Sequence, residues 1–410
     1  MIVLKAMKSI AVWSTVMIGL TGASAQPTPA PTDAYKIEET RLGPIDAERL
    51  AIVFSRDARH KAYVTHKGQK LSVVVDGQAG TEYDAVEGLV FSPDSQHVAY
   101  AARKGKKSLV VVDGQGGTEY DGAVGVIVFS SDSKRMAYAF AKGKINLAGG
   151  CTNCKWSLVV DGQVGSEYDS ISVPIFSPDG KRVAYAATKH GKWLVVVDGQ
   201  AAGEYDVLSA LIFSPDGKRV AYAAKKGGTW SVVADGQPAA QYDGFVPGSL
   251  IFSLDSKRVG YLAWKGPKWL VVVDGQTVAE HDGVGGLIFS PDGKRVAYVA
   301  NKGKKLLVVV DGRASAEYDG FVPGSLIFSP DGKRVAYAFA KGEIGSAGSC
   351  PKCKWSMVVD GEAGAEYDGV GRLIFSPDGK RVAYLAKKDA RWLAVVDGKA
   401  SAEYDGIGPP

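Results

Sequence analysis

Short apolar runs separated by polar turns recur along most of the chain. One stretch shows the pattern, with runs at Leu211–Ser214, Arg219–Lys225 and Trp230–Ala234 divided by turn residues. Short runs bounded by Gly, Pro, Asp and Lys predict β-strands joined by tight turns. The run Trp193–Val197 is apolar at every position, which is typical of a strand covered on both faces. The pattern therefore predicts an all-β protein whose sheets lie against one another.

One module is copied nine times. Each copy carries Phe-Ser-x-Asp, a Tyr nine residues after the Phe and a later Asp-Gly pair. A closing Tyr-Asp follows in eight copies, and His281-Asp282 takes its place in the other. The Phe residues are Phe54, Phe91, Phe129, Phe176, Phe213, Phe252, Phe289, Phe328 and Phe375. Because the fixed points are spaced alike, the copies are expected to share one backbone path.

The first turn of each copy has a recognisable chemistry. In Ser214-Pro215-Asp216-Gly217, Pro presets a turn dihedral, Asp bonds its own backbone and Gly accepts a left-handed conformation. The sequence therefore predicts a hairpin at this point of every copy. This chemistry also accounts for the nine turn aspartates, such as Asp179 and Asp292, as turn formers and not as acids or cation ligands.

The run FSPDGKRVAY at residues 213–222 resembles the WD-like repeat of TolB-type β-propellers, and the resemblance covers residues 51–410. It implies a β-propeller of about four-stranded antiparallel blades. Nine repeats would give nine blades in one closed ring. An eight-bladed ring with an irregular extra sheet, or two smaller rings, would use the same repeats. The resemblance is confined to the propeller, so no role of TolB is expected from it.

The first residues have the organisation of a secretory signal peptide. Lys5 and Lys8 precede the apolar run Ile10–Leu20, and the small residues Ala23-Ser24-Ala25 follow. We therefore predict a signal peptide at 1–25, a Pro-rich linker at 26–34 and the repeat domain at 35–410. The mature chain is expected to be periplasmic or secreted and to have no membrane span.

The four cysteines form two C-x-x-C pairs, Cys151 with Cys154 and Cys350 with Cys353, in the two longest copies. An oxidising compartment favours a local disulfide in each pair. Zinc bridging and a redox role are the alternatives, but a four-thiolate site would need both inserts to meet. The c-type haem motif is absent, because Lys155 and Lys354 stand where His is required.

The sequence offers no candidate catalytic residue. It contains no G-x-S-x-G, H-E-x-x-H or phosphate-loop motif. The histidines are His60, His66, His97, His190 and His281, none of them at metal-ligand spacing, and His281 occupies a Tyr position. Six Trp residues that open the third strand are expected to pack in the core: Trp156, Trp193, Trp230, Trp269, Trp355 and Trp392. We predict no enzyme, no metal and no cofactor, with a polysaccharide lyase or hydrolase of propeller type as the alternative.

The turn after the second strand is basic in every copy. The full chain carries a net charge of +5, so the position of these lysines matters more than the total charge. The residues predicted to bind are Lys104, Lys106, Lys107, Lys225, Lys226, Lys302, Lys304, Lys305, Lys387 and Lys388. Equivalent turns emerge on one side of a propeller, which favours a scaffold that binds a protein or an anionic polysaccharide, with no nucleic acid expected. The alternative is that the lysines serve solubility and are partly neutralised by the Tyr-Asp carboxylates.

Overall fold

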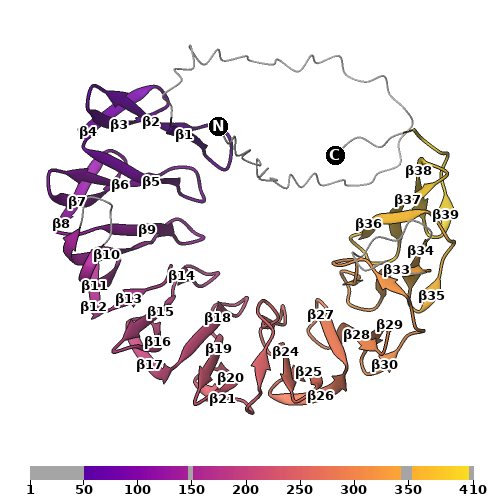
Figure 1. Cartoon of the computed structure of the whole chain (residues 1–410). Helices are drawn as coiled ribbons and strands as arrows, with labels where there is room; N and C mark the ends of the chain where they lie inside the picture. Colours follow the sequence, from indigo (N-terminus) through magenta and orange to yellow (C-terminus); the bar gives the residue numbers. More distant parts are fainter. Residues whose placement is uncertain (1–49, 146–150, 343–352, 406–410) are drawn as a thin grey trace, which may run out of the picture. The chain divides into compact units, whose positions relative to one another are not determined.

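The computed structural model describes residues 50–145, 151–342 and 353–405, and these residues form nine antiparallel sheets in chain order (Figure 1). Each sheet is built from one sequence repeat, and we number the sheets 1 to 9. Six sheets have four strands, and sheets 4, 6 and 8 have five because their first strand is interrupted. The all-β fold of propeller-type blades predicted from the repeats is confirmed.

Sheets 1 to 3 consist of β1 Leu50–Phe54, β2 Lys61–Lys67, β3 Lys70–Val75, β4 Gln78–Tyr83, β5 Ala85–Phe91, β6 Val98–Lys104, β7 Lys107–Val112, β8 Gln115–Tyr120, β9 Val124–Phe129, β10 Met136–Ile145, β11 Cys151–Val160 and β12 Gln163–Tyr168. Sheets 4 to 6 consist of β13 Ser170–Ile171, β14 Ile175–Phe176, β15 Val183–Lys189, β16 Lys192–Val197, β17 Gln200–Tyr205, β18 Val207–Phe213, β19 Val220–Lys226, β20 Thr229–Ala234, β21 Gln237–Pro238, β22 Gly244–Phe245, β23 Ile251–Phe252, β24 Val259–Lys265, β25 Lys268–Val273 and β26 Gln276–His281. Sheets 7 to 9 consist of β27 Gly283–Phe289, β28 Val296–Lys302, β29 Lys305–Val310, β30 Arg313–Ala314, β31 Gly320–Phe321, β32 Ile327–Phe328, β33 Val335–Lys341, β34 Lys354–Val359, β35 Glu362–Ala363, β36 Gly369–Phe375, β37 Val382–Lys388, β38 Arg391–Val396 and β39 Lys399–Ala400.

The strands of every sheet follow one another in sequence order, as β1-β2-β3-β4 do in sheet 1. Antiparallel neighbours place the turns between strands one and two, and between strands three and four, at the same edge. We call this end of the strands the serine edge, after the Ser of the Phe-Ser-x-Asp turns, and the word does not refer to the outer strands of the sheet. The turn between strands two and three and the connection to the next sheet lie at the opposite edge, the lysine edge.

The serine-edge turns confirm that the repeated Asp is a turn former. In sheet 5, the Ser214 hydroxyl donates to Asp216 Oδ1 at 2.6 Å and accepts from the Arg219 amide at 2.9 Å. The hydrogen bond from Ser214 lowers the pKa of Asp216 below its ordinary value. Gly217 closes the turn at a φ of 73°, where a side chain would be strained. The same Ser–Asp hydrogen bond occurs in all nine copies.

The core lies between consecutive sheets, because the third strand of each interior sheet is buried on both faces. In β16, Val196 packs with residues of sheet 3, whereas the adjacent Val195 packs with residues of sheet 5. Both side chains are almost fully buried. The predicted role of Trp193 and its counterparts is confirmed only in part, since Trp156 and Trp230 are partly buried at the border of these clusters.

A pair of aromatic rings spans each junction between consecutive sheets. In sheets 5 and 6, the rings of Tyr242 and Tyr261 lie 5.9 Å apart at 75°, with their hydroxyls 3.2 Å apart. Burial raises the pKa of the equivalent Tyr100 and Tyr384 to about 12. His281 fills the Tyr position as predicted, and its Nε2 lies 3.3 Å from the Tyr298 hydroxyl. The repeated Tyr thus serves inter-sheet packing.

Replacing Tyr261 with Phe should lower the free energy of unfolding by about 1 kcal/mol, because the buried Tyr242 hydroxyl loses its partner. Urea unfolding of the purified chain measures this as a lower midpoint. The control is Tyr404→Phe, since Tyr404 is 53% exposed and solvent can hydrate its hydroxyl. Equal midpoints for the two variants would contradict a structural role of the hydroxyl pair.

The insert of sheet 3 continues the hairpin of β10 and β11, with Ile145 opposite Cys151. Neither Cys154 nor Cys353 is a free thiol. The side chain of Cys151 and the whole of Cys350 lie outside the described residues. The two predicted disulfides, Cys151–Cys154 and Cys350–Cys353, therefore remain a prediction. The signal peptide at 1–25 and the linker at 26–34 also lie outside these residues.

Mass spectrometry of the intact chain without reductant should show a mass lower by about two hydrogens for each C-x-x-C pair. Peptides mapped before and after reduction would place each bond within its own insert. Recovery of stoichiometric zinc with alkylatable thiols would contradict the disulfides.

Candidate functional site

The lysine-edge turns are tight hairpins that project basic side chains. In sheet 7, the backbone of Lys302 is opposite that of Lys305 in the antiparallel register, and Gly303 in the turn has a φ of 59°. Because equivalent turns end the second strand of every sheet, the predicted binding lysines all lie at this kind of edge.

Carboxylates from the sheet-to-sheet connections lie among these turns. Asp206, which follows β17, accepts from Lys192 Nζ at 2.6 Å and from the Gly227 amide at 2.8 Å. Lys192 belongs to sheet 4 and Gly227 to sheet 5, so one carboxylate links two sheets. The hydrogen bond from Lys192 is the main cause of a lowered pKa for Asp206. Equivalent bridges are made by Asp84, Asp169, Asp282, Asp319 and Asp368. The repeated Tyr-Asp is therefore an inter-sheet link.

Carboxylates at the lysine edge form ion pairs with some of the predicted binding lysines. Lys107 pairs with Asp121 at 2.6 Å, Lys302 with Glu317 at 2.8 Å, and Lys305 with Asp319. Lys387 Nζ lies over the Trp392 ring. The remaining six make no ion pair with any residue that the structure describes: Lys104, Lys106, Lys225, Lys226, Lys304 and Lys388. The lysine edge thus holds structural lysines beside unpaired ones.

Sheet 5 departs from the repeat at this edge. Thr229 stands where most other copies have Lys, and Gln241 stands where most have Glu. Asp243 accordingly bonds the Gly266 amide at 2.6 Å without the usual lysine. Lys226 consequently has no ion pair within the described ranges. Lys225 makes no ion pair there either, although its charge helps to lower the pKa of Asp206.

Arginine clamps join the sheets at the serine edge. In sheet 6, Arg258 Nε donates to Asp274 Oδ2 at 2.9 Å, and its Nη1 donates to the Lys294 carbonyl of sheet 7 at 3.1 Å. The guanidinium also lies 5.3 Å from the centre of the Phe289 ring. The same three contacts recur at Arg135, Arg182, Arg219, Arg295 and Arg334. Each clamp thus connects the Asp-Gly turn of one sheet to the first turn and the Phe ring of the next.

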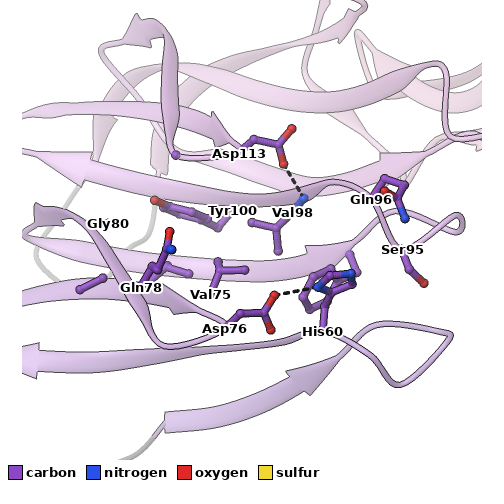
Figure 2. A pocket seen from close by; sticks show the side chains of 14 residues that line it. His60, Val75, Asp76, Gln78, Gly80, Ser95, Gln96, Val98, Tyr100 and Asp113 are labelled. Atoms are coloured by element: carbon purple, nitrogen blue, oxygen red, sulfur yellow. Dashed lines mark hydrogen bonds and ion pairs between the residues drawn. The ribbon is translucent and has the colours of Figure 1, made fainter.

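The first two sheets carry histidine in place of this arginine. His60 Nδ1 lies 2.7 Å from Asp76 Oδ2, and His97 Nδ1 lies 2.7 Å from Asp113 Oδ2. A cavity of about 500 Å³ opens between sheets 1 and 2, with His60, Asp76, Gln96 and Asp113 around it (Figure 2). The two histidines are a polar departure from the repeat, and no role for them was predicted from the sequence. Aligning the repeats on Phe-Ser-x-Asp would have revealed it, because the other seven copies have Arg at this position.

The remaining histidines lie away from this cavity. His66 lies on β2, and the His190 amide donates to Asp169 at the lysine edge. Among the described residues, no group of three or more His, Cys, Asp or Glu side chains is arranged to hold a metal ion. The described part of the chain also contains no helix long and apolar enough to cross a membrane.

No protein-family model and no curated protein matches the chain. Among solved structures, a eukaryotic initiation factor aligns over 84% of this chain and 96% of its own, at 14% identity and a TM-score of 0.38. The β-propeller domain of the Trilobed protease from Pyrococcus furiosus aligns over 67% and 94%, at 15% identity and a TM-score of 0.29. TolB from Acinetobacter baumannii aligns over 62% of each chain, at 16% identity and a TM-score of 0.26. The nine sheets themselves, and not these distant alignments, show the fold of this chain.

Proposed function

We propose that this protein is an exported, non-catalytic β-propeller scaffold that binds an anionic polymer or an acidic protein surface through its lysine edge. The observation that carries the proposal is the set of unpaired lysines, of which Lys104, Lys106 and Lys304 are examples. Neighbouring lysines of the same turns are paired with carboxylates. An unpaired ammonium can exchange water and counter-ions for an anionic partner without first breaking an ion pair.

Repetition favours an extended partner over a small one. Each turn offers one to three charges, and a single exposed ion pair contributes little, typically about 0–1 kcal/mol. Several turns that engage one polymer would act together, because the first contact raises the effective concentration of the next. Such binding should depend strongly on salt.

The proposal of export has two supports. The first is the basic, apolar and small-residue order of residues 1–25. The second is that neither Cys154 nor Cys353 is a free thiol, as suits an oxidising compartment.

Two triple variants with the same change in charge test the binding surface. Lys104→Gln, Lys106→Gln and Lys304→Gln together remove unpaired charges, whereas Lys107→Gln, Lys302→Gln and Lys305→Gln together remove paired ones. With a soluble uronate polymer as the probe, the first variant should bind about tenfold more weakly than the unchanged chain. The second should lose less affinity. Both should remain folded, since exposed substitutions change stability little.

The measurement is a binding titration repeated between about 0.02 M and 0.15 M salt, over which the Debye length falls from roughly 20 Å to 8 Å. Affinity should fall across this range. Binding that ignores both salt and the unpaired lysines would contradict the proposal and leave these lysines as solubility devices.

The second candidate function is the polysaccharide-cleaving enzyme, and the cavity beside His60 is the observation that favours it. Incubating the chain with the same uronate polymer and measuring polymer length separates the two candidates. Cleavage that disappears in His60→Gln would establish the enzyme. Binding without cleavage would support the scaffold.

A further inference from the structure

The cavity between sheets 1 and 2 differs in its walls from the equivalent cavities elsewhere. Cavities of about 690 Å³ and 340 Å³ lie at the same place between sheets 7 and 8 and between sheets 5 and 6. Phe91 and Ser95 line the first cavity. Phe328 and Phe252 are the counterparts of Phe91 in the other two cavities, and neither lines its cavity. The reason is that the guanidinium groups of Arg295 and Arg219 lie over those rings. The shorter His60 therefore leaves the Phe91 ring open to the cavity.

The charge of the walls differs as well. Basic side chains that line the cavity between sheets 7 and 8 are Arg295, Arg313, Lys333 and Arg334. Two carboxylates line each cavity, Asp76 and Asp113 in the first and Asp311 and Asp360 in the second. No Lys or Arg lines the cavity between sheets 1 and 2, where Gln96 stands in the position of Lys333. This cavity consequently favours a cation, whereas its counterpart already contains several.

The arginine junctions show which cation fits. In each of them one guanidinium makes three contacts: with a carboxylate, with a turn carbonyl of the next sheet, and with the face of a Phe. His60 makes only the first of these, through Nδ1 to Asp76. Within the described ranges, no donor reaches the carbonyls of Ser95 and Gln96, which correspond to the carbonyls that Arg295 contacts. The cavity between sheets 1 and 2 therefore offers the face of Phe91 and these two carbonyl acceptors, which together suit a guanidinium group.

We propose that the cavity between sheets 1 and 2 binds a guanidinium group, supplied by an arginine side chain of a partner protein or by a free guanidino compound. The group stacks on Phe91 and donates to the carbonyls of Ser95 and Gln96, while His60 keeps its hydrogen bond to Asp76. The site lies at the serine edge and does not depend on the lysine-edge function proposed above.

The test titrates methylguanidinium into the purified full chain and follows its methyl protons by NMR. Stacking on Phe91 should shift these protons upfield as the site fills. Methylammonium carries the same positive charge but lacks the planar guanidinium group, so it should bind at least about tenfold more weakly.

Two variants make the test specific. His60→Arg restores the chain's own guanidinium, so it should abolish the shift without lowering the melting temperature. His66→Arg is the matched control, because it makes the same substitution at an exposed position of β2 that does not line the cavity. It should alter the affinity by no more than about threefold.

Binding that survives His60→Arg, or that both variants reduce equally, would overturn the proposal. So would equal binding of methylammonium. The source of the group is distinguished by comparing acetyl-arginine amide with free arginine. Equal affinity indicates that only the side chain is bound, as from a partner protein, and tighter binding of free arginine indicates a small ligand. Failure of polymer binding at the lysine edge would leave these results unaffected.

Discussion

Burial of both faces of each interior sheet is the constraint on which the rest of the structure depends. Val195 and Val196 are adjacent on β16, yet they pack against different neighbouring sheets. A lone four-stranded sheet would leave at least one of these faces in water at a cost of roughly 25 cal/mol per Å². The repeat is therefore the unit of folding, and it is stable only beside its neighbours.

Polar residues at both edges hold the sheets in this packing. At the serine edge Arg258 links sheets 6 and 7, and at the lysine edge Asp206 links sheets 4 and 5. Charges that recur in every copy are thus largely engaged by the scaffold itself. The side chains that a partner could bind are those that take no part in these contacts between sheets, or those at positions where a residue departs from the repeat.

The two kinds of departure have opposite chemistry. The lysine edge leaves ammonium groups such as Lys104 and Lys226 without an ion pair to the described residues, and these attract anions. The cavity at His60 and Phe91 has carboxylates and an aromatic face, and these attract a planar cation. Because each lies at a different edge of the sheets, both can be occupied together.

The sequence by itself determined the nine repeats, their turns and their second and third strands, because these follow from local signals. It did not show that the first strand is interrupted in sheets 4, 6 and 8. The Ser214 to Gly217 turn and the continuous apolar run at Trp193–Val197 each act within a few residues. Only the tertiary structure decided which lysines are free and where the cavity opens. Asp206 bonds a residue 14 positions before it and another 21 positions after it, on different sheets. His60 stands where most copies have Arg, and its effect is to leave Phe91 of the next sheet uncovered. This effect depends on contacts between sheets, which no local sequence pattern contains.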